Sequence, residues 1–217
     1  MILIVVYRLS KGVELLKTRE LIEHEEIIYE NLTTVTESIR KLGYILKPII
    51  VDERTLAIID GHHRFNALKM LGAKYIPVVY ADYNKDITDI IPGKITISIA
   101  LSPEKAVNKI YFLIKSTVKR GPHNIQIKII DNRTIINTKI RIDLADFYLN
   151  INNILKNIND PHQNSTNKIE ATLILPLINR RNIETIINQE EKLPPKTSYH
   201  ITPLKKIMKP IKLSKLM

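Results

Sequence analysis

The chain has 217 residues, of which 44% are hydrophobic and 25% charged, a formal net charge of +11, and neither cysteine nor tryptophan. This composition predicts a soluble protein with a real core, and the absence of cysteine excludes disulfides, thiolate zinc sites and cysteine nucleophiles and favours a reducing, cytoplasmic location. The positive charge indicates an anionic partner, which nucleic acid, nucleotide phosphates or an acidic membrane surface would satisfy.

The first ninety residues predict a compact α/β unit with the order strand, helix, strand, strand, helix, strand. The first apolar run is too short for a signal sequence and lacks a basic flank. Pro48 places the second strand near a sheet edge, because proline cannot donate to a strand ladder. The predicted elements are residues 2–7, 20–43, 45–51, 55–59, 61–71 and 75–83.

The predicted helix over residues 20–43 carries one charged residue on its apolar stripe. The stripe follows alternating spacings of four and three, and Glu25 occupies one of its positions. A carboxylate that faces inward is partly desolvated, which raises its pKa toward that of a useful base. The alternative is that the helix starts after Glu25, which then is only a favourable anion near a helix N-terminus. The stripe consists of Leu21, Glu25, Ile28, Leu32, Val35 and Ile39.

The strand at residues 55–59 runs through Asp60 and Gly61 directly into the next helix. Such a junction directs the backbone N–H groups of the first helical turn into the space beyond the strand, where the helix dipole favours an anion. Gly61 allows close approach of a phosphate, and His62, His63 and Arg64 add donors and positive charge. Alternatively, Asp60 is only the N-cap and the basic residues lie on an exposed turn.

A second, α+β region is predicted to follow Pro92-Gly93. We expect domains at residues 1–91, 92–191 and 192–217, the last a basic segment that returns to the site. His123 and His162 are interpreted as solvated loop histidines. The predicted strands are 94–101, 125–130, 134–142 and 171–175, the helices are 103–119, 143–156 and 182–191, and residues 157–167 form a polar loop.

The segment over residues 192–217 is rich in lysine and proline. Its lysines suit either an electrostatic arm for nucleic acid or a solvated surface segment. Earlier in the segment, Lys196, Thr197, Ser198 and His200 concentrate a cation, two hydroxyls and an imidazole. If this part folds back onto the first domain, it suits the carboxylate of a small zwitterion or a phosphate. The later lysines are Lys205, Lys206, Lys209, Lys212 and Lys215.

The string DGHHRFNALKMLG at residues 60–72, followed by a strand that contains a proline, resembles the ParB/sulfiredoxin-like superfamily. The DGHHR part is similar to the free serine kinases, whereas ParB proper has G-E-R-R. His24-Glu25 upstream of Lys47-Pro48 has the kinase spacing, and PKTSYH at residues 195–200 is similar to the family's S-P-K-T-T-R-H. The resemblance covers residues 20–83 and 194–204, and it implies a ParB/sulfiredoxin-like N-terminal domain with a smaller α+β domain.

The resemblance implies a kinase that transfers a phosphoryl group from ATP or ADP to free L-serine, giving O-phospho-L-serine. Glu25 would be the catalytic base, and Gly61, His62, His63 and Arg64 would bind the nucleotide phosphates. Asp60 would orient the serine hydroxyl or hold Mg²⁺, most simply through water. Lys196, Thr197, Ser198 and His200 would bind the substrate carboxylate or the transferred phosphate.

Several points stay open at this stage. Tyr199 replaces the family's arginine, which removes a charge from the substrate site. The residues do not fix the donor nucleotide, the oligomeric state, or whether the product serves cysteine synthesis. A ParB-like, nucleotide-dependent DNA-binding protein is the alternative function, although no helix-turn-helix is predicted after the first domain. A third hypothesis, a metal-dependent nuclease, is supported only by the adjacent pair His62-His63.

Overall fold

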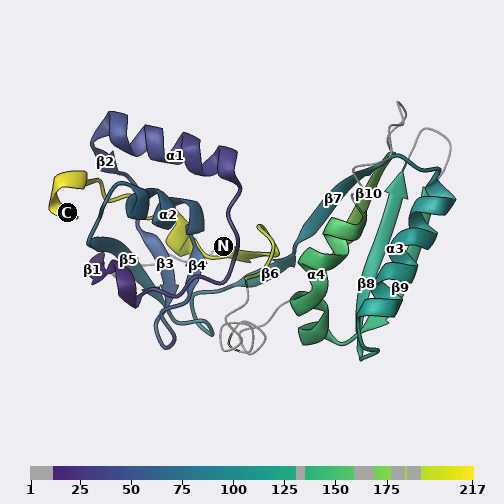
Figure 1. Cartoon of the computed structure of the whole chain (residues 1–217). Helices are drawn as coiled ribbons and strands as arrows, with labels where there is room; N and C mark the ends of the chain where they lie inside the picture. Colours follow the sequence, from purple (N-terminus) through teal and green to yellow (C-terminus); the bar gives the residue numbers. More distant parts are fainter. Residues whose placement is uncertain (1–11, 131–134, 159–168, 177–183, 185–191) are drawn as a thin grey trace, which may run out of the picture. The chain divides into compact units, whose positions relative to one another are not determined.

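A computed structural model describes residues 12–130, 135–158, 169–176, 184 and 192–217 (Figure 1). The chain divides into two compact units, and each contains more than one stretch of sequence. The first unit comprises residues 1–23, 27–89 and 200–217, and the second comprises residues 24–26 and 90–199. The predicted strand at residues 2–7 lies outside the described residues.

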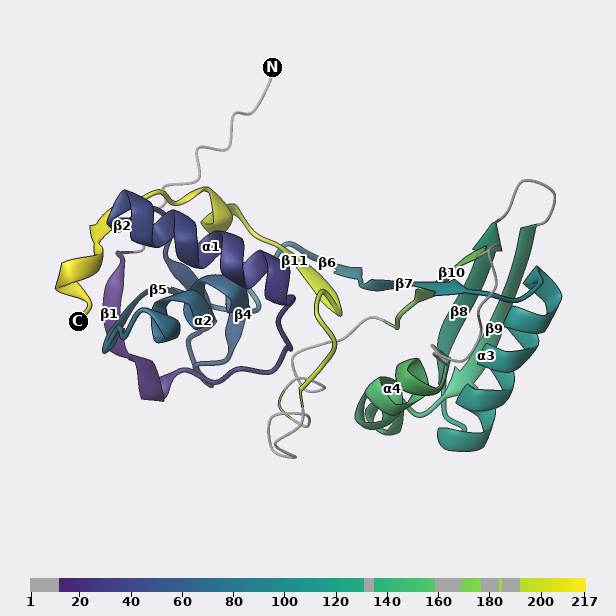
Figure 2. The ribbon, with the colours of Figure 1, turned by 45° about the horizontal axis from the view of Figure 1, so that its top comes forward.

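The first unit is built on a four-stranded sheet with the order β1-β5-β3-β4. The pair β3–β5 is parallel, and the other two pairs are antiparallel. Helices α1 and α2 pack on each other, and both contribute to the core over one sheet face, as Figure 2 shows. The bounds are β1 (Glu14–Lys17), α1 (Tyr29–Leu42), β2 (Tyr44–Ile45), β3 (Ile49–Asp52), β4 (Ile58–Asp60), α2 (His62–Met70) and β5 (Tyr75–Ala81). The predicted mixed α/β class is confirmed.

The prediction of one helix over residues 20–43 was wrong at its N-terminal end, because α1 begins only at Tyr29. Ile22 instead forms a parallel bridge with Ala57 and receives a backbone hydrogen bond from Ile58 (3.0 Å). The alternative interpretation, in which the helix starts after Glu25, is therefore confirmed. The apolar stripe in the sequence therefore spans two structures. Leu21 is buried, but it lies in an extended segment before α1 and not in the helix itself.

The strand that follows Pro48 is central, so its predicted edge position was wrong. β3 lies between β5 and β4, and all four of its residues are buried. Pro48 precedes the strand, so its missing N–H removes no ladder hydrogen bond. The two faces of β3 meet different clusters: Ile49 and Val51 face the helices, whereas Ile50 packs with Leu204 from the C-terminal segment.

The C-terminal segment is an integral part of the first unit rather than a solvated tail. β12 (Ile211–Lys212) pairs antiparallel with β2, and the carbonyl of Leu216 accepts hydrogen bonds from the N–H groups of Lys74 (2.6 Å) and Tyr75 (3.0 Å). Leu204 and Leu216 are buried. The apolar residues between the lysines cover the first unit, whereas Lys206, Lys209, Lys212 and Lys215 are exposed, as the solvated alternative predicted for the lysines. Two short 3₁₀ helices, Pro203–Lys206 and Leu213–Lys215, complete the segment.

The second unit is a four-stranded antiparallel sheet with the order β7-β10-β8-β9. Ile125, Ile127 and Ile129 alternate as buried residues along β8, and α3 and α4 cover that face (Figure 1). His123 is exposed at the start of β8, whereas residues 159–168 and 185–191, which include His162, lie outside the described residues. The bounds are β7 (Lys94–Ile99), α3 (Pro103–Thr117), β8 (His123–Ile130), β9 (Ile135–Ile142), α4 (Leu144–Ile158) and β10 (Ile169–Ile174).

A separate two-stranded pair, β6 (Asp89–Pro92) with β11 (Ser198–Ile201), contains the boundaries between the units. Just beyond β6, the Gly93 N–H donates to Thr197 O (2.9 Å), and a Cβ at Gly93 would lie 2.2 Å from that oxygen. Only glycine fits here, which explains the Pro-Gly pair in the sequence. Among the described residues, no helix has the length and apolar character needed to cross a membrane.

Candidate active site

The junction between β4 and α2 has the predicted form. β4 ends at Asp60, Gly61 has a φ of 110°, and α2 begins at His62. The first backbone hydrogen bond of the helix runs from Phe65 N–H to Gly61 O (2.9 Å), so the N–H groups of the first turn are not used within the helix. Gly61 is the N-cap and no side chain caps the helix, so the alternative interpretation of Asp60 as the N-cap was wrong.

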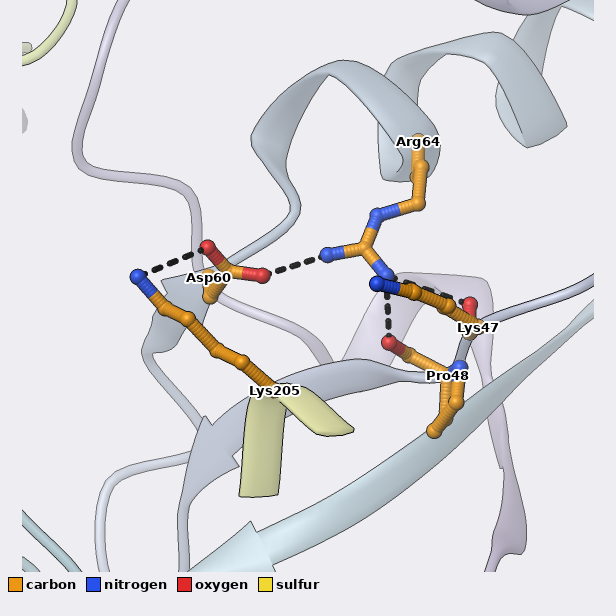
Figure 3. A network of polar contacts seen from close by, with 5 residues as sticks. All are labelled: Lys47, Pro48, Asp60, Arg64 and Lys205. Carbon is orange, nitrogen blue, oxygen red and sulfur yellow. Dashed lines mark hydrogen bonds and ion pairs between the residues drawn. The ribbon is translucent and has the colours of Figure 1, made fainter. Parts of the chain in front are cut away.

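The Asp60 carboxylate instead joins two cations, as Figure 3 shows. Arg64 lies one helical turn further along α2, and its Nη2 pairs with Asp60 Oδ2 at 2.5 Å. Its Nη1 donates to the carbonyls of Lys47 (3.2 Å) and Pro48 (2.7 Å), which precede β3. On the other side, Lys205 Nζ lies 3.4 Å from Asp60 Oδ1. Two cations on one carboxylate give the start of α2 a net positive charge.

All three side chains of this network are only partly exposed, at 22% for Arg64, 29% for Asp60 and 21% for Lys205. The fixed geometry and partial burial make these charges more effective toward a bound anion than freely solvated surface charges. The predicted cations of the C-terminal segment therefore include one, Lys205, that is held at the junction.

The backbone conformation of Gly61 requires glycine, and the guanidinium of Arg64 also lies close to where a side chain would begin. A Cβ at residue 61 would lie 2.9 Å from Arg64 Nη2, and φ near 110° is unfavourable for any residue with a side chain. The glycine thus lets the guanidinium lie across the start of the helix. This is a more specific reason than the general access for phosphate that the sequence suggested.

The two histidines of the motif differ from the expected positive pair. His62 is buried. His63 accepts a hydrogen bond at Nε2 from the Ile28 N–H (3.0 Å), so this nitrogen carries no proton and the ring is neutral. The charge at the junction therefore comes from Arg64 and Lys205, while His63 holds the segment that leads into α1.

An apolar cavity of about 340 Å³ adjoins the network. It lies against the side of α1 and β2, and Lys47, Arg64 and Met208 are at its boundary. Ligand sites commonly are clefts of this size with apolar walls and a few polar groups at one end. Its remaining lining residues are Thr34, Val35, Ser38, Ile39, Leu42, Tyr44, Ile45 and Leu46.

His200 is buried in the first unit and does not act as an exposed cation. Its Nε2 lies 2.6 Å from the Tyr83 hydroxyl, and the two rings meet edge to face. Burial and, to a smaller extent, the positive charge of Lys205 lower the pKa of His200 to about 4, although the Asp60 carboxylate acts in the opposite direction. The ring is therefore neutral at physiological pH.

The other predicted substrate residues lie in the second unit. Thr197 is fully buried, and its hydroxyl donates to Pro194 O in the preceding turn (2.5 Å). Lys196 is exposed and has a φ of 61°, which is uncommon for a residue other than glycine. Ser198 begins β11. The Thr197 hydroxyl is thus used to hold the turn from which Lys196 projects.

Glu25 lies on the short segment His24–Glu26, which belongs to the second unit. Leu193 pairs with this segment through two backbone hydrogen bonds. The Glu26 N–H donates to Leu193 O (2.7 Å), and the Leu193 N–H donates to His24 O (2.8 Å). Glu26 also accepts a hydrogen bond from Asn152 Nδ2 of α4 (3.0 Å). Burial raises the pKa of Tyr148 on α4, and the Glu25 carboxylate raises it further. The assignment of Glu25 as catalytic base stays a prediction.

Residues 11–91 match the family described as the ParB N-terminal domain. The first unit contains a ParB-like N-terminal domain. Among curated proteins, a ParB-like protein of Sulfolobus acidocaldarius is 35% identical to this chain over 77 residues. The chain is 38% identical over 73 residues to an ATP-dependent L-serine kinase of Staphylothermus marinus, and 37% over 67 residues to the ADP-dependent L-serine kinase SerK of Thermococcus kodakarensis.

These matches cover 36%, 32% and 29% of this chain and 38%, 29% and 28% of the respective relatives, so the chain aligns with well under half of each relative. The fold likeness is more extensive. A free serine kinase variant in complex with AMP matches with a TM-score of 0.68 and 18% identity, over 95% of both chains. The predicted resemblance to the serine kinases of this superfamily and the predicted fold are thereby confirmed.

Sequence reasoning missed Lys205 as a part of the junction in the ParB-like domain. The available signal was weak, since Lys205 is one of several lysines in the C-terminal segment. The residues beside it are more informative, because Thr202 caps the 3₁₀ helix Pro203–Lys206 through a hydrogen bond from Leu204 N–H (3.2 Å). That Thr-Pro-Leu start predicts a short ordered turn that would fix the lysine in place.

Proposed function

We propose that the protein is a kinase that phosphorylates free L-serine, with ATP or ADP as the phosphoryl donor. The observation that carries the proposal is the Arg64–Asp60–Lys205 network at the start of α2, with an apolar cavity next to it. A nucleotide needs these two environments side by side, one for phosphates and one for the base. The fold likeness to a free serine kinase and the names of the two kinase relatives support the choice of acceptor.

In this proposal the donor phosphates lie at the start of α2. The helix supplies N–H groups and the positive end of its dipole, and Arg64 and Lys205 neutralise charge on the phosphate oxygens. The adenine occupies the apolar cavity, where Val35 and Ile39 of α1 would pack on the ring. Phosphoryl transfer depends mainly on positioning and charge neutralisation, and this arrangement provides both.

Mg²⁺ is the metal expected with a nucleotide donor. Asp60, whose two carboxylate oxygens pair with Arg64 and Lys205, would hold it through water. No group of three or more metal-ligating side chains occurs among the described residues. Mg²⁺ is usually held by one or two carboxylates together with waters and substrate phosphates. When bound, the ion would neutralise phosphate charge.

For the acceptor, Glu25 takes the proton from the serine hydroxyl while the serine oxygen attacks the terminal phosphorus of the donor. The new oxygen–phosphorus bond gives O-phospho-L-serine, and the broken phosphoanhydride bond leaves ADP from ATP or AMP from ADP. Lys196, exposed on its turn, binds the substrate carboxylate together with Ser198, two residues further along the chain. Thr197 and His200 support this site from buried positions.

The test is to incubate the purified protein with L-serine, Mg²⁺ and either ATP or ADP, and to detect phosphoserine by ³¹P NMR and mass spectrometry. We expect phosphoserine with at least one nucleotide, and none when glycine replaces serine, because glycine lacks the hydroxyl. If neither nucleotide gives phosphoserine, the proposal is wrong.

A ParB-like, nucleotide-dependent DNA-binding protein is the second candidate, favoured by the ParB-like relative and the net charge of +11. The described part of the second unit argues against it. α3 and α4 are separated by the hairpin β8–β9, whereas a helix-turn-helix joins its two helices by a short turn. Tight duplex binding that weakens steeply with salt, without phosphoserine formation, would favour this candidate.

A further inference from the structure

A second cavity, of about 470 Å³, lies wholly within the second unit, between α3 and the edge strand β9. The two elements lie side by side in both views of the ribbon (Figures 1 and 2). Four cations are among the described residues that line it, and none of these residues is acidic. The lining consists of Tyr111, Lys115, Val118, Arg120, Lys139, Ile140 and Arg141.

The cations come from three different segments. Tyr111 and Lys115 are one turn apart on α3, and the ammonium of Lys115 lies 5.7 Å from the centre of the Tyr111 ring. Lys139 and Arg141 are two residues apart on β9, so they point to the same face of that strand, which is the face of Gln126 on β8 and not the one that α3 covers. Arg120 lies in the connection between α3 and β8. A surface lysine on an edge strand often only prevents aggregation, but that role does not explain cations from α3 and its connection.

The connection that carries Arg120 is fixed to the end of β9. Lys119 N–H donates to Asp146 Oδ2 (2.6 Å), and Asp143 N–H donates to Lys119 O (2.7 Å). At Gly121, a Cβ would lie 2.6 Å from Ile142 O, so the backbones touch there. The backbone that carries Arg120 is therefore fixed, while the side chains of all four cations are exposed.

We propose that this cavity binds a small molecule with two or more phosphate groups, at a site separate from the α2 junction. Four positive charges around one cavity match a polyphosphate rather than a single monoanion, and the volume is that of a small-molecule site. Nucleic acid backbones are usually met by a basic patch or stripe along one face, whereas these four residues line a single cavity at the edge of the sheet. The Tyr111 hydroxyl adds a neutral donor. The proposal does not depend on the kinase activity.

Tripolyphosphate is the probe, with the full chain in solution. Lysine acetylation followed by mass spectrometry should show protection of Lys115 and Lys139 as tripolyphosphate is added, while Lys94 and Lys105, exposed in the same unit, stay reactive. This measurement uses the unaltered protein, so it does not depend on the folding of a variant. Equal protection of all four lysines, or of none, would overturn the proposal.

Calorimetry on two double variants gives the second test. Lys115→Gln with Arg141→Gln should weaken the tripolyphosphate binding event assigned by footprinting about tenfold or more, because two charge-assisted contacts are lost. Lys94→Gln with Lys105→Gln removes the same net charge elsewhere in the unit and should change the affinity less than about twofold. Equal losses would mean general charge attraction and would refute a site. Tighter protection of Lys115 and Lys139 by a DNA or RNA oligonucleotide would also refute it, in favour of a nucleic-acid surface.

Discussion

Lys205 and Asp60 form an ion pair of 3.4 Å that attaches the C-terminal segment to the start of α2. Asp60 also pairs with Arg64 on the same helix, so one carboxylate sets the positions of two cations from distant parts of the sequence. Both cations would neutralise the donor phosphates in the proposed kinase, which makes Lys205 a direct target for substitution.

Lys205→Ala should weaken ADP or ATP binding about tenfold, because one charge-assisted contact to phosphate is lost. The stability of the fold should change by less than about 1 kcal/mol, as expected for a partly exposed ion pair. Calorimetry gives the affinity, and urea unfolding gives the stability. Lys206→Ala, an exposed position on the same 3₁₀ helix, is the matched control. If both variants bind nucleotide like the wild type, Lys205 does not contact the donor.

Gly61→Ala should reduce both stability and nucleotide affinity. Its positive φ costs about 1–2 kcal/mol with any side chain, and the added methyl would displace Arg64, 2.9 Å away. Gly72→Ala provides the control, because Gly72 also has a positive φ (82°) but nothing lies within 4 Å of its added Cβ. Both variants should lose stability in urea, and only Gly61→Ala should lose affinity. Equal affinity losses would show that the Arg64 contact is unimportant.

Met208 is a partly exposed lining residue of the apolar cavity, and Met208→Trp should lower ADP affinity about tenfold because the larger ring obstructs the space for the adenine. Met70→Trp, an exposed position on α2, adds the same side chain at the surface. Fluorescence titration with ADP compares the two. Unchanged affinity in Met208→Trp would exclude the cavity as the adenine site.

Stability should fall between about pH 6.5 and pH 4 because of His200. The pKa of its ring is about 4 in the folded chain and 6.5 in the unfolded chain, so the unfolded state binds more protons in this window. The contribution is complete above about pH 6.5, and on the order of 3 kcal/mol is lost on acidification to about pH 4. Urea unfolding at pH 7 and about pH 4.5 measures the loss. His200→Asn removes the titrating group, so its stability should depend less on pH, and an equal dependence would contradict this account.

Glu25→Gln should abolish phosphoserine formation while nucleotide affinity stays close to that of the wild type, because only the proton acceptor is lost. The neighbouring Glu26→Gln removes the same charge from a residue whose carboxylate accepts from Asn152, and it should retain turnover. Rates of phosphoserine release and ADP affinity are measured for both variants. Full activity in Glu25→Gln would show that another group is the base.

Local sequence signals predicted the junction well. A short apolar run, Asp60-Gly61 and a helical spacing are contained within about fifteen residues, and each has a local physical cause. The start of α1 was harder to predict. Leu21 is buried because its neighbour Ile22 pairs with Ala57, and the spacing of apolar residues does not reveal such a pairing. Lys205 could not be assigned, since its partner is distant in the sequence. The neutral state of His63 likewise depends on a backbone N–H from Ile28, outside its own motif.

The return of residues 200–217 to the first unit has a consequence for biosynthesis. The second unit, apart from residues 24–26, is contained in residues 90–199, whereas Leu216 is a buried member of the first unit's core. During translation the early residues of the first unit therefore wait for partners that leave the ribosome after the second unit, so the second unit is able to fold first. Until Leu216 emerges, the core of the first unit lacks one of its buried residues, and its apolar neighbours stay exposed.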